Sequence, residues 1–169
     1  PRVRYEVGTA EHTGLPEASV DLVTAAQAAH WFALAPFVAE LRRVLRPGGL
    51  AALWTYEKFR AGDAVDRLVD DFYRDVVGPY WPPERRHVEE RYRRLELPLE
   101  AVFAPEFELW TEWDVETALA YLGTWSAVQR CRRLRGADPL SLLAPLLRPA
   151  WGPDRRALRW PIHLRACRA

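Results

Sequence analysis

Methionine is absent from this sequence of 169 residues, lysine occurs once, and cysteine occurs twice. The two cysteines, Cys131 and Cys167, stand alone and far apart, which argues against a disulfide framework. They suit reduced thiols in a cytoplasm, and no signal peptide is evident. No apolar run approaches the roughly 18 residues that a membrane span needs. The net charge of +1 offers no broad positive field for nucleic acid or anionic lipid.

Several catalytic constellations are missing as well. The sequence shows no Ser/His/Asp set, no cysteine nucleophile and no cluster of metal ligands, which disfavours hydrolases and metalloenzymes. The chain begins with Pro1 in place of methionine, so we expect it to be a piece of a longer protein.

What is present is typical of a globular protein, since 49% of the residues are hydrophobic and 28% are charged. The most informative stretch begins with an apolar segment at 20–26, as in a parallel strand covered on both faces. An elbow of small residues follows, then an amphipathic helix from Pro36, a Pro-Gly-Gly stop at 47–49 and a second apolar strand at 50–54. This order predicts a βαβ unit with parallel strands, whose carboxyl ends are the expected place for a ligand.

Further elements are predicted from periodicity and from Pro and Gly breaks. Asp114, Thr124 and Asp138 are each expected near the start of a helix. Besides the βαβ unit, we expect strands at 2–7, 103–113 and 158–166, and helices at 63–77, 114–121, 124–133 and 138–147. Strands and helices that alternate in this way indicate an α/β fold.

Short motifs are spread over essentially the whole chain. They are Gly8-Thr9-Ala10-Glu11, Val20-Asp21-Leu22-Val23, His30-Trp31-Phe32, Arg43-Val44-Leu45-Arg46-Pro47-Gly48-Gly49, Pro79-Tyr80-Trp81, Tyr121-Leu122-Gly123-Thr124-Trp125-Ser126 and Trp160-Pro161. Together they resemble class I S-adenosylmethionine-dependent methyltransferases, and in particular the small-molecule branch that includes trans-aconitate methyltransferase-like proteins.

The resemblance implies a Rossmann-like methyltransferase fold, with a mostly parallel sheet and a final antiparallel strand. Residues 2–7 would be its third strand, and its first two strands would be absent. In the family those strands carry a glycine-rich loop and an acidic residue that hold the cofactor. Gly48-Gly49 does not replace that loop because it ends a helix. The chain would be a single, N-terminally incomplete methyltransferase domain, residues 1–169, with a lid-like insertion on the substrate side at about 60–100.

The resemblance also implies residues that bind the cofactor, S-adenosyl-L-methionine. Thr9, Ala10 and Glu11 would border its adenine, and Ala26 and Gln27 would lie beside its methionine portion. From the residues alone, Glu11 could equally be a solvated loop carboxylate and Gln27 a polar cap of the strand end.

The acceptor side is implied in the same way. His30 would face the methyl group as the candidate catalytic base, and the substrate-binding residues would be Trp31, Tyr80, Trp81, Arg85 and Trp125. A carboxylate acceptor would suit arginine and need little activation, whereas an alcohol or amine would need a base. Two alternatives stay open: Trp31 could pack in the core, and Arg85 could belong to a charged helix face.

The sequence therefore predicts methyl transfer from S-adenosyl-L-methionine to a small-molecule acceptor, without a nucleic-acid or membrane partner and with no particular oligomeric state indicated. The donor brings the reactivity, and the protein brings position and a dry pocket. One alternative is a non-catalytic, truncated methyltransferase-fold remnant or interaction module that binds no cofactor. Another is a nucleotide-binding oxidoreductase, which would need the glycine loop that is absent.

Overall fold

The computed structural model describes residues 3–169, so Arg2 of the predicted first strand lies outside the described residues. The chain divides into two compact units. Unit 1 contains the described residues up to Glu57 together with Arg86–Phe107 and Ile162–Ala169, and unit 2 contains Lys58–Arg85 and Glu108–Pro161.

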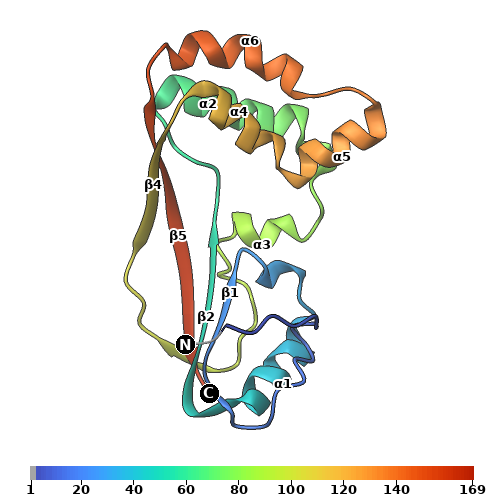
Figure 1. Ribbon diagram of the computed structural model, residues 1–169, viewed down its shortest axis with the longest axis vertical. Helices are drawn as coiled ribbons and strands as arrows, with labels where there is room; N and C mark the ends of the chain where they lie inside the picture. The colour runs from blue at the N-terminus through green and yellow to red at the C-terminus, as the bar shows by residue number, and fades with distance from the viewer. Residues whose placement is uncertain (1–2) are drawn as a thin grey trace. The chain divides into compact units, whose positions relative to one another are not determined.

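Figure 1 labels the helices and all of the strands except β3. In chain order, the elements are β1 (Val20–Ala26), α1 (Leu34–Val44), β2 (Leu45–Tyr56), α2 (Asp63–Asp71), α3 (Arg85–Glu89), β3 (Glu100–Val102), β4 (Phe107–Trp113), α4 (Val115–Gly123), α5 (Ser126–Arg135), α6 (Leu140–Trp151) and β5 (Arg156–Arg168). Short 3-10 turns lie at Ala29–Trp31 and Gly78–Tyr80, and α2 continues into a π-helical turn at Phe72–Val76.

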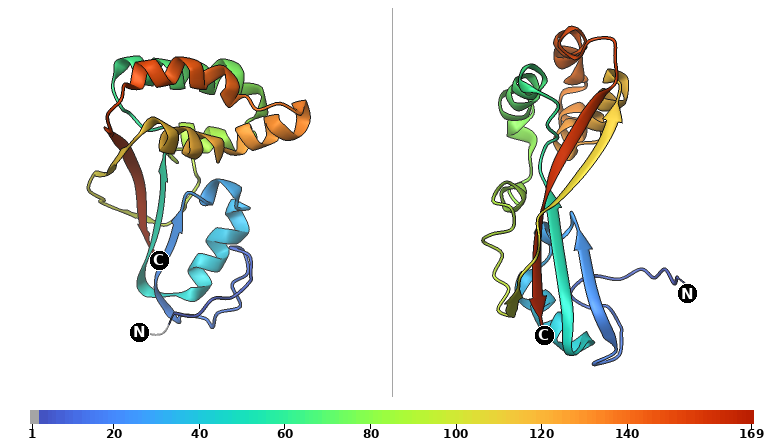
Figure 2. Two further views of the ribbon diagram at one scale, coloured as in Figure 1. Left: turned by 45° about the horizontal axis from the view of Figure 1, so that its top comes forward. Right: turned by 90° about the vertical axis from the view of Figure 1, so that its left-hand side faces the viewer.

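The sheet is built on a parallel pair, as the sequence predicted. Leu22 of β1 lies opposite Leu50 of β2, and Thr24 lies opposite Ala52. β5 runs antiparallel along the other side of β2, and the strand order is β1-β2-β5-β3, with β4 also paired to β5 (Figure 2). The predicted βαβ unit and the antiparallel last strand are therefore confirmed.

The core of unit 1 lies on one face of this sheet. Ala25, Leu53, Phe37 of α1 and Tyr92 from the segment after α3 all belong to one buried cluster. The other face of β1 is open within unit 1, where the Leu22 side chain is 52% exposed. The expectation that β1 is covered on both faces was wrong, because α1 and the segment after α3 both pack on the same face.

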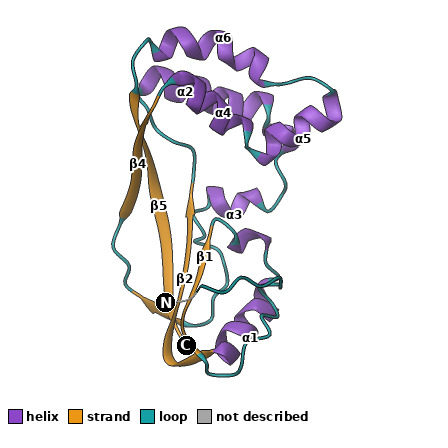
Figure 3. Cartoon of the chain, viewed as in Figure 1, coloured by secondary structure: helices purple, strands orange, loops and turns teal. Residues whose placement is uncertain are grey.

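Residues 3–7 form no strand, contrary to the expectation for 2–7, and Figure 3 draws this stretch as loop. The side chains of Val3, Tyr5 and Val7 are all exposed. Alternating side chains favour a strand only where a neighbouring strand or a core receives them. The described residues supply neither here, and the far edge of β1 likewise has no partner strand among them.

Of the three side chains expected near a helix start in unit 2, Asp114 is the N-cap of α4, whereas Asp138 comes just before Pro139, the N-cap residue of α6. Asp114 Oδ1 accepts a hydrogen bond from Thr117 N at 2.8 Å, and Asp138 Oδ1 accepts one from Leu140 N at 3.1 Å. Thr124 was expected to cap α5, but its hydroxyl donates back to Tyr121 O at 2.6 Å. Within residues 3–169, no helix has the length and apolar character to cross a bilayer.

Candidate functional site

The elbow after β1 is held by the side chain of Gln27. Its Oε1 accepts hydrogen bonds from Thr55 Oγ1 at 2.6 Å and from Tyr56 N at 3.0 Å, and its Nε2 donates to Tyr56 O at 3.0 Å. Gln27 has a φ of 50°, a left-handed conformation that is uncommon outside glycine. The side-chain amide therefore continues the hydrogen-bond ladder of the β1–β2 pair beyond the last residue of β1. It connects the carboxyl end of β1 to that of β2.

His30 lies in the 3-10 turn at the end of the elbow (Ala25–Trp31), and its side chain is largely buried. Its Nδ1 is 2.9 Å from the hydroxyl oxygen of Tyr92, a residue with no exposed surface. A hydrogen bond at one ring nitrogen fixes the orientation of the imidazole. Trp31 is 54% exposed beside it, with a ring-centroid separation of 4.8 Å, so Trp31 is not a core residue.

The loop that carries Thr9, Ala10 and Glu11 is attached to the start of α1. Glu11 Oε1 accepts a hydrogen bond from the amide of Ala33, the residue that precedes α1, at 2.8 Å. This bond is the main reason that the pKa of Glu11 lies below its ordinary value. A carboxylate is favoured at the amino end of a helix, where amide groups are unpaired. Glu11 is thus a positioning residue for this loop.

Glu40 of α1 holds the same loop a few residues further on. Its Oε1 accepts hydrogen bonds from both the amide and the hydroxyl of Thr13, at 2.8 and 2.6 Å. Arg43 donates to both carboxylate oxygens of Glu40 at 2.8 Å. Arg43 and Thr13 together hold the pKa of Glu40 far below its usual range. The Glu40 carboxylate is largely buried, and the four hydrogen bonds that it accepts from Thr13 and Arg43 stabilise its charge in place of water.

The predicted substrate residues of unit 2 meet in an aromatic cluster, with the exception of Tyr80. The ring of Trp81 lies 5.7 Å from Trp125 and 4.8 Å from Tyr73, measured between centroids. The guanidinium of Arg85 lies over Trp81 at 4.6 Å, and its Nε donates to the Tyr73 hydroxyl at 3.1 Å. Arg85 therefore packs on rings and is not simply part of a charged helix face. Tyr80 instead accepts a hydrogen bond from an arginine of α5.

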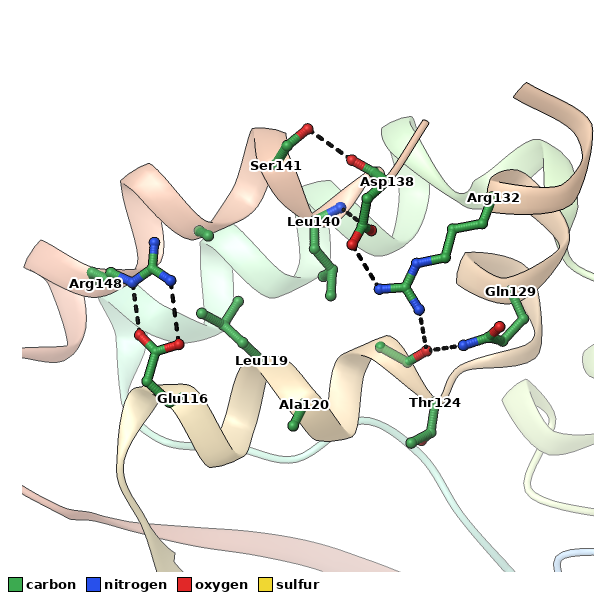
Figure 4. A pocket seen from close by; sticks show the side chains of 12 residues that line it. Glu116, Leu119, Ala120, Thr124, Gln129, Arg132, Asp138, Leu140, Ser141 and Arg148 are labelled. Carbon is green, nitrogen blue, oxygen red and sulfur yellow. Dashed lines mark hydrogen bonds and ion pairs between the residues drawn. The ribbon is translucent and has the colours of Figure 1, made fainter. Parts of the chain in front are cut away.

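A hollow of about 680 Å³ lies among α4, α5 and α6 in unit 2 (Figure 4). Ion pairs stand at its two sides, Arg148 with Glu116 at 2.7 Å and Arg132 with Asp138 at 2.8 Å. Its charged groups are thus already paired with one another, and no predicted site residue lines it. We interpret it as a groove between packed helices.

The predicted site residues fall into two groups, one in each unit. Unit 1 holds Thr9, Ala10, Glu11, Ala26, Gln27, His30 and Trp31, and unit 2 holds Tyr80, Trp81, Arg85 and Trp125. Two residues of these groups were not among the predicted site residues: Tyr92, which is 62 residues from His30, and Tyr73 in the aromatic cluster. No local pattern signals either pairing, because both depend on tertiary packing. In residues 3–169, no group of three or more His, Cys, Asp or Glu side chains could hold a metal ion.

Known proteins resemble this chain closely. Residues 1–53 match the sequence profile described as a methyltransferase domain. A solved structure described as a type II methyltransferase from Anaeromyxobacter dehalogenans shares 51% sequence identity and a TM-score of 0.89, over 99% of this chain and 72% of that chain. A Dictyostelium discoideum protein named as a methyltransferase is 32% identical over 127 residues, which is 73% of this chain and 48% of the relative. An uncharacterised methyltransferase of Mycobacterium tuberculosis is 47% identical over 63 residues, 37% of this chain and 26% of the relative.

The match to the Anaeromyxobacter structure shows the family, and this chain belongs to the methyltransferases. Its α/β architecture is the Rossmann-like methyltransferase fold that the sequence predicted. The chain spans about half the length of the curated Dictyostelium relative. The profile match at residues 1–53 includes β1, the elbow with Gln27 and His30, and all of α1.

The role of Gln27 can be tested by shortening its side chain. We expect Gln27→Ala to lower the free energy of unfolding by about 1–3 kcal/mol, because Thr55 and Tyr56 lose buried hydrogen-bond partners. Gln27→Asn is the matched control, since asparagine tolerates a left-handed backbone but is one methylene too short to reach Tyr56. Urea unfolding measures both. An Asn variant as stable as the native chain would mean that backbone strain, and not these hydrogen bonds, governs the elbow.

The Glu40 network predicts sensitivity to acid. The pKa of Glu40 is depressed in the folded chain, so its contribution to stability is present above its ordinary value of 4.5 and is lost as the pH falls toward the folded pKa. The midpoint of thermal unfolding should therefore fall with acidification below that pH. Glu40→Gln should be less stable at neutral pH and show a shallower decline. Parallel declines in the two proteins would contradict this role for Glu40.

Proposed function

We propose that this chain contributes to methyl transfer from S-adenosyl-L-methionine to a small-molecule acceptor. The observation that carries the proposal is His30, held at the carboxyl end of β1 with its Nδ1 on the Tyr92 hydroxyl, in a chain of the methyltransferase family. Ligands of open α/β sheets bind at this end of parallel strands. The proposal includes a cytoplasmic setting and no nucleic-acid or membrane partner.

The elbow fits a donor that is contacted by small residues and backbone. Ala26 is exposed at the end of β1, and Ala28 follows Gln27, so little side-chain volume stands in the way. Glu11 and Gln27 already bond Ala33 and Tyr56, which makes them positioning residues first. When bound, the donor supplies an electrophilic methyl group on a positively charged sulfur, which leaves as a neutral thioether. The chain holds the acceptor in line with that methyl group and excludes water.

Acceptor chemistry depends on what must be deprotonated. For an alcohol or an amine, His30 is the candidate base, and the Tyr92 hydroxyl orients its ring. For a carboxylate, as in the trans-aconitate methyltransferase-like branch, no base is needed and a guanidinium such as Arg85 suits the anion. In this proposal Trp31 adjoins the methyl group. Tyr80, Trp81 and Arg85 belong to the lid-like insertion at about 60–100, and Trp125, whose ring lies 5.7 Å from that of Trp81, helps to roof the acceptor pocket.

A second candidate function is a non-catalytic module that binds no cofactor. The observation that favours it is the open side of β1, where Leu22, Thr24 and Ala26 are exposed and the far edge has no partner strand in the described residues. A parallel strand is ordinarily covered on both faces. The two candidates differ in whether this chain binds the donor.

Two measurements separate them. Calorimetric titration with S-adenosylhomocysteine should show micromolar binding if the chain takes the donor, and no heat if it is a non-catalytic module. Transfer from S-adenosyl-L-methionine is then followed with a panel of small carboxylates, alcohols and amines. His30→Ala should keep the binding but lose about 10²–10⁴-fold in rate with alcohols or amines, the usual share of general-base catalysis.

Tyr92→Phe refines the test, because it keeps the ring that packs in the core and removes only the hydroxyl. It should lower the same rates by a smaller factor than His30→Ala. The transfer rates with carboxylate acceptors should hardly change in either variant, because these acceptors need no base. Undiminished turnover of alcohols and amines by His30→Ala would remove His30 from the mechanism.

A further inference from the structure

A second cavity, of about 380 Å³, lies within unit 1 beside β5. It opens along Ile162–Arg165, next to the three residues of β5 that pair with β3. Its other walls are Arg91 and Arg93 from the segment after α3, and residues 104–106 between β3 and β4. None of the residues assigned above to the donor or the acceptor lines it.

The charges around this cavity are mostly positive. Arg91, Arg93 and Arg165 contribute three guanidinium groups, and Glu106 is the carboxylate on the wall. Glu57 is not a lining residue, but its Oε1 accepts a hydrogen bond from Arg91 Nε at 2.8 Å. The same Oε1 is 3.0 Å from Nε2 of His163, which also lines the cavity. The Glu57 carboxylate thus orients both Arg91 and His163, but its single negative charge does not cancel the positive charges of the three arginines.

Arg165 is fixed by the backbone, and not by a carboxylate. Its Nη1 donates to the carbonyl oxygens of Tyr92 and Leu95, each at 2.8 Å. Carbonyl acceptors hold a guanidinium in place while leaving its full positive charge. Its remaining N–H groups have no acceptor among residues 3–169, so they are available to a bound anion.

Arg93 is the group with most freedom to bind a ligand. Its guanidinium is exposed and forms no hydrogen bond or ion pair with the described part of the chain. It follows two residues in the left-handed conformation, Arg91 and Tyr92, each with a φ of 57°. Consecutive left-handed residues other than glycine are strained, and such strain is concentrated at ligand clamps and active sites. With the backbone in this turn, the side chain of Arg91 bonds Glu57, and Arg93 lines the cavity.

We propose that this cavity is a binding site for a small oxyanion, either a carboxylate or a phosphate group. Arginine forks match the geometry of both anions, and two of the three guanidinium groups are positioned before the anion arrives. The carboxylate of Glu106 repels an anionic ligand, so it lowers the affinity of the cavity for the oxyanion. The site does not depend on the methyl transfer proposed above, because it shares no residue with the donor or acceptor positions.

The test is a titration of the purified chain with inorganic phosphate and, separately, with malonate, at constant ionic strength and followed by calorimetry. Arg93→Gln should raise the dissociation constant about tenfold, which corresponds to one charge-assisted hydrogen bond. Arg94→Gln is the matched control, because Arg94 is the next residue, carries the same charge, is exposed and lies outside the cavity. It should leave the dissociation constant unchanged.

Glu106→Gln separates binding from misfolding, because it should tighten binding where Arg93→Gln weakens it. Binding of phosphate alone, of malonate alone or of both would support the site and identify its ligand class. If neither anion binds, or if Arg93→Gln and Arg94→Gln weaken binding equally, the proposal is overturned. Unchanged thermal midpoints confirm that the variants are folded.

Discussion

Gln27 closes the parallel ladder between β1 and β2, and the position of the elbow that carries His30 and Trp31 depends on that closure. β1 is an edge strand among the described residues, so β2 is its single strand partner there. The main-chain amide of Gln27 donates to Trp54 O, and the side-chain amide bonds Tyr56 on both its N–H and its C=O. A slip of one residue in this register would turn every side chain of β1 to the opposite face. The polar elbow therefore fixes the strand that precedes it.

The turn at Arg91 and Tyr92 is the second constraint, and it acts over long sequence distances. Left-handed residues cost of order 1–3 kcal/mol each and persist only where the surroundings hold them. Here the surroundings are the Glu57 carboxylate, the Arg165 guanidinium and His30, each bonded to one part of the turn. The turn thus connects the end of β2, the middle of β5 and the elbow. A rigid Tyr92 hydroxyl is what gives the His30 ring a single orientation.

The parts of this structure that could be predicted from the sequence are those with local causes. The apolar run at 20–26 and the Asp114 cap each act through their immediate neighbours, and both form much as expected. The Pro-Gly-Gly at 47–49 does not end the helix as predicted, because α1 ends at Val44 and these three residues lie within β2. Residues 3–7 show the limit of the same reasoning. Their alternation indicates which side chains could share a face, but it does not supply the partner strand. In the same way, the run in β1 is nearly continuous in apolar residues, yet unit 1 covers only one face of it.

The candidate site was harder to predict because its polar residues bond to groups far away in the sequence. The sequence leaves Glu11 open as a cofactor contact or a solvated carboxylate, and it does not indicate that Oε1 accepts a hydrogen bond from the amide that precedes α1. His30 was identified by its place after a strand, but Tyr92 belongs to a segment whose periodicity shows only an apolar side. Side chains that lie so far apart in the sequence are brought together by the fold, so no fixed spacing between them predicts the pairing.

The bonds of Gln27 also restrict how it can meet a donor. A side-chain amide has two acceptor positions on oxygen and two hydrogens on nitrogen. Thr55 and Tyr56 N occupy both positions on Oε1, and Tyr56 O takes one hydrogen of Nε2. The remaining capacity is a single N–H, so Gln27 can donate to a ligand but has no acceptor position left. A ligand at this elbow would therefore present a hydrogen-bond acceptor to Gln27, and any ammonium group it carries would find its acceptors elsewhere, in backbone carbonyls or in carboxylates.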